Sequence, residues 1–127
     1  MTIDLAILLA SIAVVESNSD DEAIGLAGER DRYQITREVW DKWMPRKSLY
    51  LYKSLFEVGA HDHGMARWVA ERHIRFSIIP ELEKAGREVT VFAIASCWNA
   101  GIVGHLEHDR GSAYGWKVVD EYARRAK

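Results

Sequence analysis

Two stretches of the chain are apolar on nearly every side. The first runs from Leu5 to Val15 and the second from Val89 to Asn99. A helix that is apolar all round is buried, whereas a surface helix carries a single apolar stripe. The pattern therefore predicts two buried helices. The first covers about Ile3 to Ser17 with Thr2 as its N-cap, and the second is closed at its C-terminal end by Gly101.

Weaker helical patterns surround these two stretches. They predict short helices over 37–43 and about 49–56, a longer segment over 64–86, and a final amphipathic helix capped by Ser112. Pro80 interrupts the longer segment by a kink or by a new helix, and we expect a new helix. Residues 23–35 contain two glycines and a strand-like ending, which favours a small irregular hairpin. We expect a mainly α (α+β) fold.

The composition narrows the range of functions. The chain has 127 residues, one cysteine and a formal net charge of −2. This length predicts one domain over residues 1–127, and the small net charge gives no field that would attract nucleic acid. The N-terminal apolar run is too short to cross a bilayer and has Asp4 in place of a basic region, so we expect no membrane insertion and no signal peptide. Cys97 is expected to be a buried, non-catalytic thiol.

Glu16 follows the first apolar run and continues its core-facing stripe. In a helix, Leu8, Leu9, Ile12 and Ala13 lie behind it on the same face. Apolar surroundings and the negative end of the helix dipole both raise the pKa of a carboxyl group. A carboxylic acid that stays protonated near neutral pH suits a general acid. The alternative is an ordinary acid at a helix end that turns into water.

Three short motifs then occur in order, at 15–17 (VES), 28–35 (GERDRYQI) and 95–101 (ASCWNAG). Together they resemble the goose-type lysozyme and soluble lytic transglycosylase family, which are glycoside hydrolases that cut the glycan strands of peptidoglycan. That family has Glu-Ser at the end of a buried helix, a hairpin ending in Tyr-Gln-Ile, and a helix ending in Tyr-Asn-Ala-Gly. The resemblance covers roughly residues 5–103 and implies a lysozyme-like fold.

The resemblance implies a mechanism with one essential carboxyl group. Glu16 would protonate the oxygen of the β-1,4 bond between N-acetylmuramic acid and N-acetylglucosamine, and would then act as a base. A proton taken from water gives hydrolysis, whereas one taken from the muramic acid 6-hydroxyl gives a 1,6-anhydro product. No metal or cofactor is needed.

Whether a second carboxylate takes part in the reaction is left open. Asp20, Asp21 and Glu29 are near in sequence, and we expect Glu29 to be the catalytic helper because it lies on the predicted hairpin. The alternative is a surface charge or a pair with Arg30.

By the same resemblance, five residues would bind the substrate: Ser17, Tyr33, Gln34, Trp98 and Asn99. Gln34 would offer its amide to an N-acetyl group, and Asn99 would orient the catalytic acid or the sugar. Each has a structural alternative. Alternation along a strand would put Tyr33 in the core and Gln34 outside, and Asn99 is a common residue at a helix end.

The chain departs from the family pattern at two places. Asp31 and Arg32 stand where family hairpins usually carry a glycine, so a turn with positive φ is less favourable there. Trp98 replaces a tyrosine, and its indole N–H could take the place of the lost hydroxyl. Four aromatic residues are candidates for a sugar-binding wall or for the core: Trp43, Tyr50, Tyr52 and Tyr114.

Two other classes of function remain open. His61 and His63 flank Asp62, and His105 and His108 have the spacing of ligands on one helical turn, so a metal hydrolase is the second hypothesis. The third is a non-catalytic scaffold or interaction module with the same fold. For the glycosidase, the partner is a peptidoglycan strand. We expect synthesis in the cytoplasm and action at the cell wall or periplasm, with delivery by a partner or a lysis system.

Overall fold

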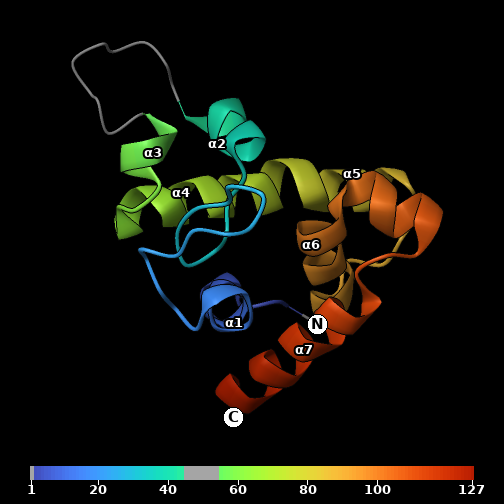
Figure 1. Ribbon diagram of the computed structural model, residues 1–127. Helices are drawn as coiled ribbons and strands as arrows, with labels where there is room; N and C mark the ends of the chain where they lie inside the picture. The colour runs from blue at the N-terminus through green and yellow to red at the C-terminus, as the bar shows by residue number, and fades with distance from the viewer. Residues whose placement is uncertain (1, 45–54) are drawn as a thin grey trace.

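The structure is a computed structural model and describes residues 2–44 and 55–127. In these residues the chain is mainly helical, which confirms the predicted class (Figure 1). The elements follow in the order α1 (Leu5–Ser17), α2 (Arg37–Trp43), α3 (Phe56–Gly59), α4 (His63–His73), η2 (Ile74–Ile78), α5 (Ile79–Lys84), α6 (Val91–His108) and α7 (Ser112–Arg125).

Helix α1 is the buried helix that the first apolar run predicts. It begins after Asp4, whose carboxylate accepts a hydrogen bond of 3.1 Å from the Ile7 N–H. The predicted N-cap, Thr2, was therefore wrong by two residues. The stripe expected behind Glu16 is confirmed, because all four of its residues are exposed by 2% or less: Leu8, Leu9, Ile12 and Ala13.

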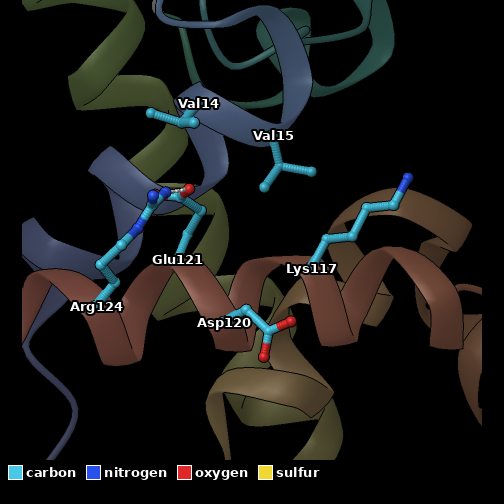
Figure 2. Close-up of a pocket in the computed structure, with 6 residues that line it drawn as sticks. All are labelled: Val14, Val15, Lys117, Asp120, Glu121 and Arg124. Atoms are coloured by element: carbon cyan, nitrogen blue, oxygen red, sulfur yellow. Dashed lines mark ion pairs between the residues drawn. The ribbon is translucent and has the colours of Figure 1, made fainter.

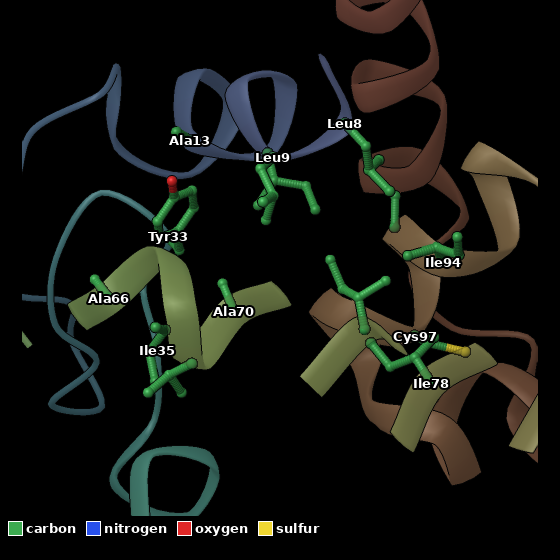
Figure 3. Close-up of a cluster of buried hydrophobic side chains, with 14 of the residues drawn as sticks. Leu8, Leu9, Ala13, Tyr33, Ile35, Ala66, Ala70, Ile78, Ile94 and Cys97 are labelled. Atoms are coloured by element: carbon green, nitrogen blue, oxygen red, sulfur yellow. The ribbon is translucent and has the colours of Figure 1, made fainter. Parts of the chain in front are cut away.

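The core surrounds α1 on several sides. Figure 3 shows Leu8, Leu9 and Ala13 of α1 facing side chains from the α1–α2 connection, α4, η2 and α6. Helix α7 packs against both α1 and α6. Among the buried residues is Cys97, and burial raises the pKa of its thiol to about 11, which agrees with the predicted inert cysteine.

Residues 63–84 form one continuous helical segment. The expected new helix at Pro80 is confirmed in part, because α5 begins at Ile79 with Pro80 in its first turn. The sequence did not predict that the chain enters α5 from α4 through the π-helical turn η2, with helical backbone angles kept at the junctions. A π turn is wider than an α turn, and it ends directly before the first turn of α5. The first turn is the part of a helix that best tolerates proline.

Helix α6 contains the second apolar run but does not end where the sequence indicates. Gly101 leaves the helical conformation with φ 78° and ψ 163°, and a helix then resumes and continues to His108. Glycine adopts this positive φ without steric cost. The helix resumes because Ile102 and Leu106, beyond the kink, still pack against the core. The predicted helix end at Gly101 is therefore confirmed as a break in the helix, but the sequence did not predict the helical residues that follow it.

The remaining helices agree with the sequence in part. Helix α2 has the predicted range, and the Thr36 hydroxyl caps it by accepting a hydrogen bond of 3.2 Å from the Val39 N–H. Helix α7 starts at Ser112, but its N-cap is Gly111. Helix α3 covers the end of the predicted 49–56 helix, most of which lies outside the described residues.

Residues 23–35, within the α1–α2 loop (residues 18–36), were expected to form a small irregular hairpin. They contain two isolated antiparallel bridges, Ile24 with Arg30 and Arg30 with Ile35, and no regular strand. The predicted hairpin is thus not confirmed. The physical reason is that Asp31 and Gln34 have positive φ angles of 68° and 54°, which interrupt extended backbone.

Within residues 2–44 and 55–127, every helix is too short or too polar to cross a lipid bilayer.

Candidate functional site

Glu16 lies in the last turn of α1, one residue before the helix ends at Ser17. Its side chain is half-buried, and burial raises the pKa of its carboxyl group to about 7, in the direction that the sequence predicts. Desolvation disfavours the charged form, and the negative end of the helix dipole acts in the same direction. A large fraction of the carboxyl group is therefore protonated at neutral pH, which is the state that a general acid requires.

Two side chains from different elements adjust this pKa in opposite directions. The Tyr114 hydroxyl, from the first turn of α7, lowers the pKa of Glu16 by hydrogen bonding, and the negative charge of Glu29 raises it. The contact with Tyr114 does not have regular hydrogen-bond geometry, and the buried hydroxyl has no regular partner among the described residues. Such contacts often tighten only when a site is occupied or ionised.

Glu29 and Gln34 converge above Gly25 in the α1–α2 loop. A Cβ atom at Gly25 would overlap the Glu29 carboxylate and would lie 2.5 Å from Gln34 Oε1. The nitrogen of the Gln34 side-chain amide is fixed as well, because Nε2 donates a hydrogen bond of 2.8 Å to the Asp31 carbonyl. Glu29, the expected helper, affects the pKa of Glu16 through its charge. Gln34 lies beside Glu29 over Gly25. One donor of the Gln34 amide is already used within the protein.

Asp31 makes a turn with positive φ in the α1–α2 loop, at a position where glycine was expected to be more favourable. It has a φ of 68°, and its Oδ1 accepts a hydrogen bond of 2.6 Å from the Tyr33 N–H. Aspartate tolerates positive φ when its side chain bonds the backbone two residues on, so this departure does not prevent the turn. The side chain is fully buried, and burial raises the pKa of Asp31 to about 8. Its Oδ2 has no hydrogen-bond partner in the described residues.

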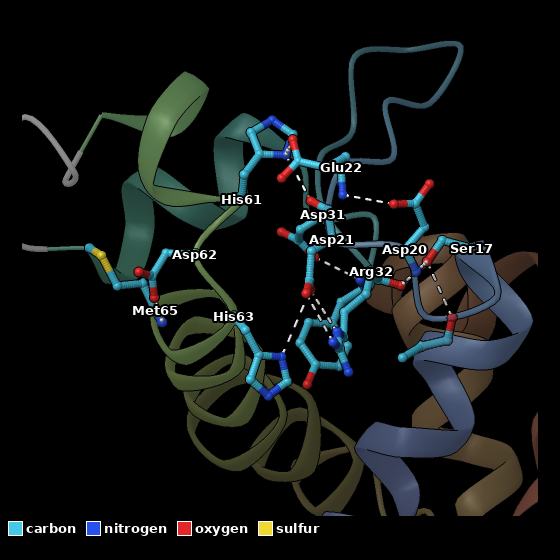
Figure 4. A network of polar contacts seen from close by, with 12 residues as sticks. Ser17, Asp20, Asp21, Glu22, Asp31, Arg32, His61, Asp62, His63 and Met65 are labelled. Atoms are coloured by element: carbon cyan, nitrogen blue, oxygen red, sulfur yellow. Dashed lines mark hydrogen bonds and ion pairs between the residues drawn. The ribbon is translucent and has the colours of Figure 1, made fainter.

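Polar contacts tie the loop to α1 and to the start of α4 (Figure 4). The Ser17 hydroxyl donates a hydrogen bond of 2.8 Å to the Arg32 carbonyl, so this residue, which was expected to bind substrate, joins the helix end to the loop. The Arg32 guanidinium donates to both Asp21 carboxylate oxygens, at 2.7 and 3.0 Å, and holds the pKa of Asp21 below its usual value. His61 Nδ1 lies 2.8 Å from the Asp21 carbonyl, and His63 Nδ1 lies 3.8 Å from the Asp21 carboxylate.

The other predicted substrate residues are placed differently from one another. Tyr33 is 3% exposed and belongs to the core, as the structural alternative supposed. The Trp98 indole N–H donates a hydrogen bond of 3.1 Å to the Tyr33 carbonyl, so this indole supports the loop from α6. Asn99 is exposed on α6, and no hydrogen bond joins it to Glu16 in the described residues. The structure thus places Glu29 within electrostatic reach of Glu16 and Gln34 near Glu29, and it shows no hydrogen bond from Asn99 to Glu16 in the described residues.

Sequence reasoning did not identify Tyr114 and Asp31 as neighbours of the acid. Tyr114 was named only as a candidate aromatic wall, and nothing in the spacing links α7 to the end of α1. Trp43, also named for the wall, is half-buried against His73. Tyr50 and Tyr52 lie outside the described residues.

A groove of about 440 Å³ is lined in part by Val14 and Val15, the two residues before Glu16. It lies on another face of α1 than Glu16. It runs between α1 and α7, and Figure 2 shows Val14 and Val15 opposite Lys117 and the polar face of α7. Two acids line this groove. Glu121 is paired with Arg124, and Asp120 is exposed on α7, whereas Glu16 is half-buried.

The histidines do not form a metal centre in the described residues. No group of three His, Cys, Asp or Glu side chains there is arranged to bind a metal ion. His61 and His63 belong to the loop contacts above, while His105 is buried in α6 and His108 is exposed at its end. The metal hypothesis therefore gains no support from this part of the chain.

The titration of Asp31 leads to a stability prediction. A carboxyl group whose pKa rises on folding stabilises the protein at low pH, and this stability is lost as pH rises from about 4 to about 8. Asp31→Asn keeps an oxygen for the Tyr33 N–H and removes the titration. The variant should gain about 1–3 kcal/mol over the wild type between pH 4 and pH 8, measured by urea unfolding across that range.

Asp109→Asn is the matched control, because Asp109 also has positive φ but is exposed. Its difference from the wild type measures the effect of the same amide substitution at an exposed residue with positive φ. A pH-independent difference for Asp31→Asn would mean that the Asp31 carboxyl does not titrate abnormally.

The two neighbours of Glu16 should shift its pKa in opposite directions. Tyr114→Phe removes a hydrogen bond that favours the ionised form, so the pKa should rise above about 7, whereas Glu29→Gln removes a negative charge, so it should fall. Carbon-13 NMR of the labelled Glu16 carboxyl group measures both shifts, each expected to be roughly half a unit or more. Shifts of the same sign would contradict this arrangement.

Comparison of the chain with protein-family models, with curated proteins and with solved structures finds no match in any of the three.

Proposed function

We propose that this protein is a glycosidase that cleaves peptidoglycan, with a lysozyme-like fold and Glu16 as its general acid and base. The observation that carries the proposal is the Glu16 carboxyl group, half-buried at the end of the central helix with a pKa of about 7. An acid in this state can donate a proton to a glycosidic oxygen at neutral pH.

The proposed reaction begins with proton transfer from Glu16 to the β-1,4 oxygen between N-acetylmuramic acid and N-acetylglucosamine. The C–O bond breaks, and positive charge develops on the sugar that keeps the anomeric carbon. The Glu16 carboxylate then accepts a proton from water, which gives hydrolysis, or from the muramic acid 6-hydroxyl, which gives a 1,6-anhydro end. In either case the proton returns to Glu16, and the enzyme is ready for another cycle.

Glu29 supports this cycle through its charge. Because its carboxylate raises the pKa of Glu16, it helps the acid regain a proton after the bond breaks. A negative charge near the reacting sugar also stabilises an oxocarbenium-like transition state. Gln34 stands beside Glu29 over Gly25 and is the second polar group that a sugar would meet there.

The loop contacts favour a prearranged site. Ser17 fastens the loop to the end of α1, and Trp98 fastens it to α6, at hydrogen-bond distances of 2.8 and 3.1 Å. Groups held in place before the substrate binds need no reorganisation during the reaction. This support takes the place of the strands that a regular hairpin would supply.

Replacement of Glu16 by glutamine should abolish cleavage while keeping the size and shape of the side chain. Loss of a general acid lowers rates by about 100-fold or more, measured as clearing of purified peptidoglycan. Wild-type activity should also fall as pH rises above about 7, because Glu16 loses its proton there. Mass spectrometry of the fragments distinguishes reducing ends from 1,6-anhydro ends.

Glu107→Gln is the control, since Glu107 is exposed at the end of α6. It should act like the wild type. Equal activity of the wild type and Glu16→Gln would sink the catalytic proposal and leave the non-catalytic scaffold as the better interpretation.

Gly25→Ala tests whether the Glu29 and Gln34 side chains matter to the reaction. The new methyl group would displace the ends of both side chains, which are flexible, so the free energy of unfolding should change by less than about 1 kcal/mol. Cleavage should fall by roughly tenfold or more, because small displacements of positioned groups are costly to catalysis. Gly64→Ala is the control, because its methyl group would make only ordinary contacts in α4. Unchanged cleavage by Gly25→Ala would remove Glu29 and Gln34 from the site.

A further inference from the structure

A small recess lies where the α1–α2 loop, α2, α4 and α6 meet. Its volume is about 40 Å³, and its lining consists of Gln34, Ile35, Thr36, Val39, His73 and Trp98. One water-sized atom needs about 10–15 Å³ of such space. The recess therefore admits three or four heavy atoms, which is the size of an acetyl group and far smaller than a sugar ring.

His73 is held in one tautomer at this recess. The Trp43 indole N–H donates a hydrogen bond of 3.1 Å to His73 Nδ1. An indole nitrogen is only a donor, so Nδ1 must accept, and the single ring proton of the neutral histidine must be on Nε2. Burial, together with the positive charge of Lys42, lowers the pKa of His73 to about 4, so the ring is neutral at the pH where Glu16 can act as an acid.

The Nε2–H group of His73 is an unused donor. It makes no hydrogen bond within residues 2–44 and 55–127. The other nitrogen donors of the lining are at least partly engaged, because Trp98 Nε1 donates to the Tyr33 carbonyl and Gln34 Nε2 donates to the Asp31 carbonyl. His73 is therefore a lining residue with a fixed, uncharged donor.

The lining has a polar side and an apolar side. Gln34 and Thr36 are polar, and the Thr36 hydroxyl accepts a hydrogen bond of 3.2 Å from the Val39 N–H. On the apolar side Ile35 is buried, Val39 is half-buried, and the Trp98 ring packs edge-on against His73 with ring centroids 5.8 Å apart. A small recess with polar and apolar walls suits a group with one acceptor oxygen and one methyl group. An acetamido group has both, and a hydroxyl group has no methyl group to fill the space.

We propose that this recess binds the acetamido group of an N-acetylated sugar, with His73 Nε2–H donating to the acetamido carbonyl and Val39 and Trp98 contacting the methyl group. The identification of the ligand as a sugar rests on the proposed function. The assignment makes His73 a specificity-determining residue, because a sugar without the acetyl group leaves the donor without a partner. Gln34 lies at the boundary between this recess and Glu29.

Sugar binding can be measured separately from cleavage. The Glu16→Gln protein serves as the background, with tri-N-acetylchitotriose as the acetylated probe and cellotriose as an uncharged probe that has hydroxyl groups in place of acetamido groups. In this background tri-N-acetylchitotriose should bind about tenfold more tightly than cellotriose, since one hydrogen bond and one buried methyl group account for a difference of that size.

Three histidine variants then test the donor. His73→Phe should reduce this preference to about twofold or less, and His73→Gln should restore much of it, because an amide can accept from Trp43 and also donate to the ligand. His108→Phe, at an exposed site, should behave like the background protein. Thermal unfolding of each variant shows whether the fold is kept. His73→Gln covers the case in which His73→Phe fails to fold because the Trp43 N–H loses its acceptor.

Nitrogen-15 NMR of the histidine rings tests the tautomer directly. His73 should carry its proton on Nε2 between pH 6 and pH 8, and the Nε2 resonance should move when tri-N-acetylchitotriose is added but not when cellotriose is added. A proton on Nδ1, or no binding of the acetylated probe to the background protein, overturns the proposal.

The outcomes separate this proposal from the proposed function. If the wild type fails to cleave peptidoglycan but the acetylated probe still moves the His73 resonance, the recess stands without the glycosidase. If the wild type cleaves peptidoglycan and His73→Phe leaves the preference for the acetylated probe unchanged, the glycosidase stands and the recess assignment is wrong.

Discussion

The burial of α1 is the constraint on which the rest of the structure depends. The helix is apolar nearly all round, so it is stable only when other elements cover it, and α4, α7 and the α1–α2 loop do so. The same packing encloses the last turn of the helix, where Glu16 lies. One physical cause, the removal of apolar surface from water, thus forms the core and also raises the pKa of the acid.

The loop beside Glu16 keeps its shape without strands. Hydrogen bonds from Ser17 and Trp98 join the loop to α1 and α6. An ion pair between Asp21 and Arg32 joins the beginning of the loop to its end. Asp31 supplies the turn, and its buried carboxyl group makes the loop sensitive to pH. The arrangement places charged and polar side chains near the acid at the cost of stability as pH rises from about 4 to about 8. Such a cost is common where a protein positions groups for chemistry.

Much of the helical framework could be predicted from the sequence because it depends on local periodicity. The stripe behind Glu16, the capped helix after Thr36 and the burial of Cys97 all follow from patterns within a few residues. The features that the sequence did not predict occur where packing decided between local alternatives. A π turn let the helix pass Pro80, and core contacts of Ile102 and Leu106 let α6 resume after Gly101. No local pattern contains that information, because the packing partners are distant in sequence.

The sequence by itself determined that the chain is mainly helical and that Glu16 ends a helix with a buried face, because both follow from the spacing of apolar residues. Only the tertiary structure decided which side chains meet that acid. Tyr114 comes from α7, about a hundred residues away, and Glu29 reaches it through a loop shaped by positive φ angles. The tautomer of His73 likewise depends on Trp43 in another helix. Contacts between elements set pKa values and proton positions, and only packing in three dimensions determines those contacts.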